Sequence, residues 1–146
     1  MNRLSLRQIG VVSLLVSGMS MVAFLTPALS EEAADKTIIP ATSEGIWNAI
    51  DEKATELKTT IDSGKLENVH HEAFAIRDLV AALPSHSATL AADKLAKVKT
   101  SVKFVATLAE RLDATGDAKD VAGTKDNFTK LKGILTSIRA NYSLSP

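Results

Sequence analysis

Four stripes of apolar residues, each repeating at intervals of three and four, constrain the fold of this chain more than any other feature. This interval matches the turn of an α-helix and places each stripe on one helix face. Connections of two to six residues separate the stripes, so neighbouring helices are expected to run antiparallel. No alternating run flanks an Asn-Gly or Asp-Gly turn, which argues against strands. The pattern predicts an all-α protein, an up-down-up-down antiparallel four-helix bundle.

The stripes and the residues that bound them define the four expected helices. The stripes are Ile46, Trp47, Ile50, Ala54, Leu57 and Ile61; Leu66, Val69, Ala73, Ile76, Val80 and Leu83; Ala91, Leu95, Val98, Val102, Val105, Ala109 and Leu112; and Val121, Thr124, Phe128, Leu131, Leu135, Ile138 and Tyr142. Capping and helix-breaking residues mark the boundaries. They are Thr42 or Ser43 and Gly64 for the first helix, Pro84 for the second, Ser85 or Ser87 and Gly116 for the third, and Asp117 for the fourth.

Residues 1–30 have the three parts of a secretory signal peptide. Two arginines supply positive charge, residues 9–25 are apolar apart from Ser and Gly, and small residues stand at positions 28 and 30. The alternative is an uncleaved anchor, but the apolar run is shorter than the about 20 residues of a spanning helix. We predict cleavage after Ser30, a periplasmic or secreted protein without a stable membrane anchor, a flexible leader over residues 31–41 and a bundle over residues 42–146.

Removal of the signal peptide changes the charge and composition of the expected mature chain. Without Arg3 and Arg7, 15 basic residues face 17 acidic ones, a net charge of −2. This balance provides no basic patch for nucleic acid or anionic lipid, so we expect no nucleic-acid partner. The chain has no Cys, and all three Met residues lie within residues 1–30. The fold therefore depends on its apolar core without disulfides, and a lipoprotein is excluded.

The densest group of possible metal ligands lies in the first half of the second expected helix. It comprises Glu67, His70, His71 and Glu72, of which Glu67 and His71 are four apart and share a helix face. Imidazole and carboxylate groups suit Cu²⁺, Ni²⁺ or Zn²⁺. A tight site needs a third or fourth ligand, from His86, the mature amino terminus or a second subunit. The alternative is that His70 flanks the core and His71 is solvated.

Motifs of common enzyme classes are absent from the sequence. There is no Gly-x-Ser-x-Gly elbow, no Walker-type loop and no Gly-x-Gly-x-x-Gly. His71-Glu72 does not begin a zincin motif, because position 75 is Ala75. The carboxylate pair Asp51-Glu52 falls on the expected solvated face of the first helix, where acids are ordinary. We predict a protein that is not an enzyme.

The last expected helix contains a basic segment, residues 128–142, that includes Tyr142. This segment and the predicted architecture resemble the cytochrome b562 and cytochrome c′ group, and the resemblance implies an exported bundle that carries haem. The haem ligands of that group are missing, because the last helix has no His, the mature chain has no Met and Cys-x-x-Cys-His is absent. We expect no haem, and either a haem-less relative or an unrelated bundle of the same shape.

A second and looser resemblance is to small exported helical proteins of bacteria. It is carried by His71-Glu72, Ala82-Leu83-Pro84, and Leu112-Asp113 with Gly116-Asp117. Some of these proteins look like accessories to heavy-metal efflux. The resemblance implies a role in metal handling.

Two hypotheses for function follow from these features. The first is weak transition-metal binding by the two adjacent histidines with Glu67 or Glu72, in metal homeostasis or envelope stress. The second is a structural or adaptor module whose helix surface binds another envelope protein. The adaptor hypothesis predicts an apolar surface patch that includes Phe74 or Phe104. The alternative for both side chains is that they widen the apolar face of their helices for packing.

Overall fold

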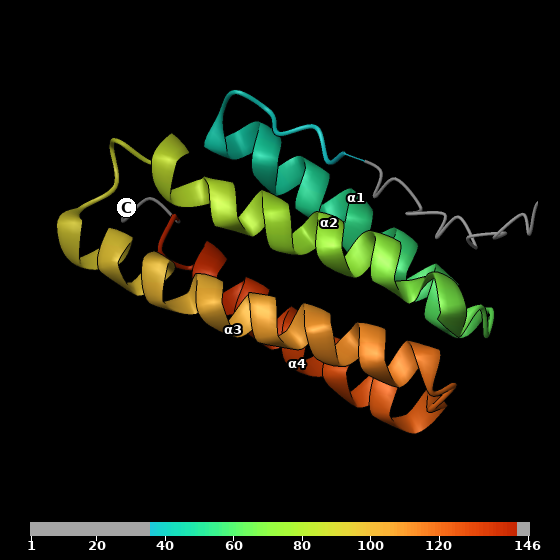
Figure 1. The fold of residues 1–146 in the computed structure, drawn as a ribbon. Helices are drawn as coiled ribbons and strands as arrows, with labels where there is room; N and C mark the ends of the chain where they lie inside the picture. Colours follow the sequence, from blue (N-terminus) through green and yellow to red (C-terminus); the bar gives the residue numbers. More distant parts are fainter. Residues whose placement is uncertain (1–35, 143–146) are drawn as a thin grey trace, which may run out of the picture. The chain divides into compact units, whose positions relative to one another are not determined.

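The computed structural model describes residues 36–142, and in this part the protein is all-α (Figure 1). The predicted signal peptide over residues 1–30 lies outside the described residues. The four helices are α1 (Ser43–Asp62), α2 (Val69–Ala82), α3 (Ala92–Asp117) and α4 (Val121–Arg139). Short 3-10 helices, η1 (Leu66–Asn68) and η2 (Leu83–His86), flank α2 at its two ends. The predicted all-α class is confirmed.

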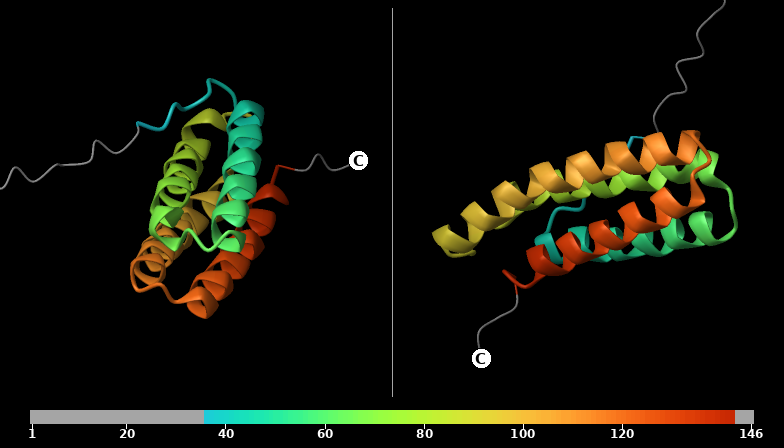
Figure 2. Two further views of the ribbon diagram at one scale, coloured as in Figure 1. Left: turned by 90° about the vertical axis from the view of Figure 1, so that its right-hand side faces the viewer. Right: turned by 90° about the horizontal axis from the view of Figure 1, so that it is seen from below.

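Each helix packs along the next one in the chain, and the pattern of contacts is consistent with an up-down bundle. The pairs α1–α2, α2–α3 and α3–α4 are closely packed. The first and last helices, α1 and α4, also lie side by side, but they contact each other much less (Figure 2). The helices therefore form three close interfaces and one looser interface, between α1 and α4.

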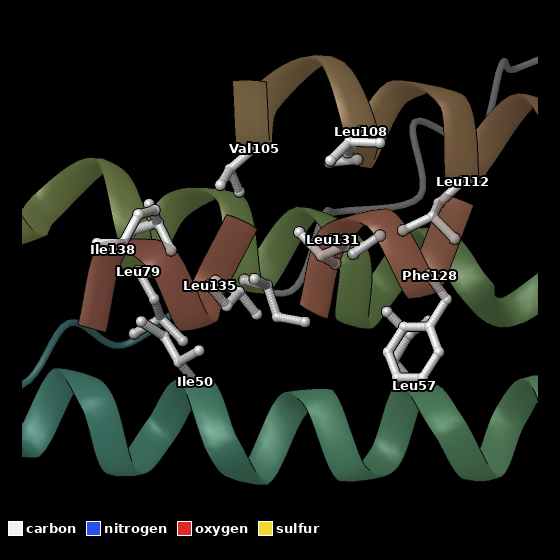
Figure 3. Packing of buried hydrophobic residues seen from close by; sticks show 14 of the residues in the cluster. Ile50, Leu57, Leu79, Val105, Leu108, Leu112, Phe128, Leu131, Leu135 and Ile138 are labelled. Carbon is white, nitrogen blue, oxygen red and sulfur yellow. The ribbon is translucent and has the colours of Figure 1, made fainter. Parts of the chain in front are cut away.

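The predicted stripes meet in one apolar core. The side chains of Ile50 and Leu57 point from α1 into the core, where those of Leu131 and Leu135 of α4 also lie (Figure 3). Fully burying a side chain of this size contributes about 1.5–3 kcal/mol, so the core is the main source of stability. The stripes are wider than predicted, because Leu79 and Leu108 are also buried.

Three residues placed in the stripes lie outside the core. Leu95, in the first turn of α3, is only half-buried and does not belong to the core cluster. Val121 is 48% exposed at the first position of α4. Ala91 is exposed and precedes the first residue of α3. All three stand at the start of a helix, away from the core, so a periodic pattern extended to the end of its helix overestimates burial.

The predicted start and end of the first helix are confirmed. The hydroxyl of Thr42 accepts a hydrogen bond from the N–H of Gly45 at 3.1 Å, which makes Thr42 the N-cap. Gly64 follows the helix with a φ of 74°, in the left-handed region that glycine adopts at low cost.

The predicted start of the third helix is wrong. Residues 83–86 continue as η2, and α3 begins at Ala92 without a cap from Ser85 or Ser87. The Ser85 hydroxyl instead donates to the carbonyl of Ala82, and buried Ser87 donates to the carbonyl of Leu83. Both hydroxyls therefore serve the turn that ends α2, since a serine can bond backward to a carbonyl as well as cap a helix.

The turn between α3 and α4 also differs from the prediction. Gly116 lies inside α3, where a Cβ atom would approach the backbone oxygen of Leu66 to 2.6 Å. The left-handed residue of the turn is Lys119, with a φ of 54°. Asp120, not Asp117, caps α4, because its carboxylate accepts from the N–H of Gly123 at 2.9 Å. Gly116 thus permits close packing, and α3 ends one residue after it, at Asp117.

Candidate functional site

The two adjacent histidines lie at the start of α2. His70 is half-buried and His71 is exposed. Their ring centroids are 3.9 Å apart, with the planes tilted by 42°. Glu67 is exposed in η1, just before this helix. The structure thus places the two imidazoles together at one end of α2.

Glu72 is directed towards α1. One of its carboxylate oxygens accepts a 3.4 Å hydrogen bond from the hydroxyl of Thr60, and the other is buried without a partner among the described residues. The pKa of Lys53 is raised, mainly by its hydrogen bond to Glu56 and in smaller part by nearby carboxylates that include Glu72. The Glu72 carboxylate therefore belongs to the interface between α1 and α2.

His86 lies in η2, at the opposite end of α2. Its Nδ1 atom is 3.0 Å from the carbonyl oxygen of Ala41, which can only accept, so Nδ1 carries the proton in this bond. The 14 residues of α2, at about 1.5 Å each, separate it from His70 by roughly 20 Å. Within residues 36–142, no three His, Asp or Glu side chains form a group that could hold a metal ion.

A shallow groove follows the loose interface between α1 and α4. We call it the seam groove; it encloses about 790 Å³. Its lining residues are Trp47, Asp51, Ala54, Thr55 and Lys58 from α1, Phe128, Lys132, Leu135, Thr136 and Arg139 from α4, and Ala140. At Trp47, Asp51 and Arg139 it meets a second depression of about 610 Å³, which extends to Lys94 and Tyr142. The weaker packing of α1 on α4 therefore leaves a continuous surface channel.

Cationic side chains of α4 cover both aromatic rings of the seam groove. The guanidinium carbon of Arg139 lies 4.5 Å from the ring centroid of Trp47. The ammonium of Lys132 lies 5.0 Å from the ring centroid of Phe128. A cation over an aromatic face contributes about 0.5–1 kcal/mol at an exposed site. Core packing and these cations together leave both residues nearly buried, with 8% of Trp47 and 6% of Phe128 exposed.

An ion pair lies where the seam groove meets the second depression. A terminal nitrogen of Arg139 lies 2.8 Å from each carboxylate oxygen of Asp51. Every other ion pair among residues 36–142 joins two residues of the same helix. Both partners are about half exposed, so the pair contributes little stability, about 0–1 kcal/mol. Its importance lies in its position, as the one charged link between helices in the described part of the chain.

Trp47 and Tyr142 continue this cluster into the neighbouring depression. Their rings meet edge to face, with centroids 5.6 Å apart. The Tyr142 hydroxyl lies 2.8 Å from the Ser87 hydroxyl, whose own proton is directed to Leu83, so Tyr142 is the donor. Burial raises the pKa of Tyr142, and the hydrogen bond with Ser87 partly offsets this effect. The indole N–H of Trp47 is buried without an acceptor among the described residues.

The two phenylalanines singled out from the sequence have different environments. Phe74 is half-buried, packs against the core and lies beneath the guanidinium of Arg77 at 4.6 Å. Phe104 is 56% exposed on α3. The structure thus assigns Phe74 to packing and leaves Phe104 as a single exposed ring.

The seam groove is not predicted by the sequence. Asp51 has the pattern of an ordinary surface acid, and Trp47 has that of a core residue. The spacing of Phe128 and Lys132, four apart on one helix, would have indicated a local contact. The pairing of Asp51 with Arg139 depends on how α1 and α4 are aligned, which is not encoded in either segment alone.

These features define the class of the protein: an all-α, four-helix protein with a groove between its first and last helices. No protein-family model matches the sequence, and comparisons with curated proteins and with solved structures found no match. Among residues 36–142, no helix combines the length and apolar character needed to cross a membrane.

Proposed function

We propose that this chain is an exported, antiparallel up-down-up-down four-helix bundle, without enzymatic activity, that binds a helix of another envelope protein in the seam groove. The observation that supports this proposal is the loose packing of α1 on α4, in contrast to the three close interfaces. A groove between two helices can accept the apolar face of an amphipathic helix. The walls are long, because α1 has 20 residues and α4 has 19.

Site-specific cross-linking in the producing cells tests this function. A photoreactive amino acid replaces Thr55 or Thr136, which are exposed on the two walls of the seam groove. The same replacement at Thr107, exposed on α3 and outside the groove, is the control. We expect both groove positions to cross-link to the same second polypeptide and Thr107 not to do so. Equal yields at all three positions would contradict the proposal.

A second candidate function is weak transition-metal binding in metal homeostasis or envelope stress, as an accessory to heavy-metal efflux. The contact between the His70 and His71 rings favours it, because their centroids are only 3.9 Å apart. Glu67 is the nearest free carboxylate along the chain, and further ligands would come from a partner or a second copy. Two nitrogen ligands suit Cu²⁺ or Ni²⁺, but they make a weak site.

Metal titration tests this second candidate. We expect Cu²⁺ or Ni²⁺ to bind the wild type weakly, with a dissociation constant above about 1 μM. This limit corresponds to a favourable binding free energy of at most roughly 8 kcal/mol. The His70→Ala/His71→Ala variant should lose this binding, and His86→Ala should retain it. Equal binding by all three proteins, or none by the wild type, would exclude the histidine pair.

We infer that the likeness to the cytochrome b562 and cytochrome c′ group is one of shape. Helix α4 contains no histidine, and the chain has no Cys. Addition of haem to the purified protein should therefore produce no Soret band.

A further inference from the structure

We propose that the seam groove selects an acidic amphipathic helix, whose carboxylates draw Arg139 and Lys132 away from the aromatic rings that these cations cover. This inference rests on the proposed function and adds the chemistry of the partner. In this proposal the side chains of Arg139 and Lys132 change rotamer when the partner helix binds, and the aromatic rings beneath them become accessible.

The first step concerns the covered rings. Trp47 and Phe128 are almost fully buried while Arg139 and Lys132 lie over them. Displacement of these cations therefore adds aromatic surface to the apolar lining that a docking helix meets. Long basic side chains move at low cost, since their charged ends remain in water while their stems change rotamer. Both cations are exposed, which leaves them this freedom.

The second step concerns the charge of the seam groove. Its charged lining residues are three basic ones and the single acid Asp51, which is engaged by Arg139. Lys58 pairs with Asp62 on its own helix, and this hydrogen bond lowers the pKa of that carboxyl. Lys132 has no ion-pair partner among residues 36–142. The groove is thus complementary to an acidic partner, since Lys132 is open to a carboxylate and Arg139 can exchange one carboxylate for another.

The third step concerns spacing. Lys132 and Arg139 are seven residues apart on α4, which is about two turns or 10 Å. A partner helix with acidic residues seven apart presents carboxylates at the same interval. Apolar residues three and four positions after the first acid would then lie between the two cations, opposite Leu135.

Two synthetic peptides of about 20 residues, long enough to form helices, provide the test. One carries Glu at every seventh position with Leu three and four positions later, and the other has Lys in place of Glu. Trp47 is the only tryptophan of the full chain, so its emission reports occupation of the groove. We expect the Glu peptide to bind roughly tenfold more tightly than the Lys peptide at low salt, with a smaller preference at high salt.

Two charge-removing variants complete the experiment. Lys132→Gln should weaken binding of the Glu peptide about fivefold. Arg77→Gln is the matched control, because Arg77 also lies over an aromatic ring, Phe74, but on α2 and outside the groove. This variant should bind as the wild type does, and circular dichroism verifies that both variants are folded. Equal loss in both variants would overturn the inference.

The remaining outcomes separate this inference from the proposed function. Equal binding of the Glu and Lys peptides would overturn the charge selection while supporting a groove that accepts helices. Binding of neither peptide would also overturn the inference. In that case cross-linking from Thr55 and Thr136 still decides the proposed function independently.

Discussion

Tyr142 connects the residues that follow α4 to the core through its ring and its hydroxyl. The ring packs on Trp47, and the hydroxyl donates to Ser87. Burial favours the neutral phenol and raises its pKa above the ordinary value of about 10. The neutral side chain therefore stabilises the fold below that ordinary pKa, and this stabilisation is lost as the pH rises through the higher pKa of the folded state.

Replacement of Tyr142 by Phe isolates this effect, because the ring stays and the ionisable group is removed. At pH 7 we expect a loss of about 0.5–1.5 kcal/mol in the free energy of unfolding, for the missing hydrogen bond. Above about pH 10 the difference between the two proteins should shrink, because the wild type alone must suppress ionisation of the phenol. Urea unfolding at several pH values measures this difference.

The absorbance of tyrosinate provides an independent check on Tyr142. The chain contains one tyrosine, so the titration curve of the folded protein belongs to this residue alone. A midpoint at or below that of the urea-unfolded protein would contradict the effect of burial.

At the scale of a helix, glycines at two positions of the long helices have opposite roles. A Cβ at Gly116 of α3 would come within 2.6 Å of the backbone oxygen of Leu66, whereas a Cβ at Gly133 of α4 would meet nothing within 4 Å. Gly116→Ala should lower the free energy of unfolding by about 1–3 kcal/mol through overpacking. Gly133→Ala should raise it by about 0.5–1 kcal/mol, because alanine favours a helix. Thermal and urea unfolding of both variants measure whether the free energy of unfolding falls for the first and rises for the second.

The cap of α4 gives a second prediction at this scale. Asp120→Ala removes the acceptor for the Gly123 N–H and should cost about 0.5–2 kcal/mol of stability. Asp117→Ala is the control, because Asp117 is exposed at the end of α3 and provides no cap in the structure. Urea unfolding distinguishes the two, and a greater loss in the Asp117 variant would favour the boundary predicted from the sequence.

The helices could be predicted because their signals are local. Residues such as Ile50, Leu57 and Val98 repeat at the helical interval and are all buried. The start of α3 and the packing role of Gly116 could not be inferred from the sequence, because Ser87 and Gly116 carry signals that serve other purposes here. Ser87 bonds backward to Leu83, and Gly116 admits Leu66. Which role such a residue takes depends on neighbours that are distant in sequence.

The candidate sites likewise depend on contacts that the local sequence pattern does not specify. Adjacent side chains on a helix do not face each other, so the contact between His70 and His71 could not be inferred from their adjacency. Their separation from His86 follows from the length of α2. The seam groove depends on Asp51 and Arg139, which are 88 positions apart. Periodicity shows that each lies on an amphipathic helix, but it gives no information on their mutual alignment.

At the scale of the whole molecule, the loose interface between α1 and α4 makes the bundle uneven. We expect Asp51→Asn to change the free energy of unfolding by less than about 1 kcal/mol, as for other exposed ion pairs. Local opening should still increase, because this pair is the charged link between α1 and α4. Hydrogen exchange followed by mass spectrometry should show faster exchange in the first half of α1 and the last turns of α4.

The matched control for this prediction is Asp78→Asn. Asp78 pairs with Arg77 on the same helix at comparable exposure. It should leave exchange in α1 and α4 unchanged. Similar acceleration in both variants would mean that the Asp51–Arg139 pair has no special role in holding the two helices together.

The contact between Trp47 and Tyr142 has a further consequence, for the connectivity of the chain. It brings the beginning of the first helix against the residues that follow the last one. A short peptide linker could therefore join the two ends of the bundle, and new ends could be opened at the exposed turn around Gly64. In such a circular permutant α4 would lead directly into α1, and the loosest interface of the molecule would become one between consecutive helices.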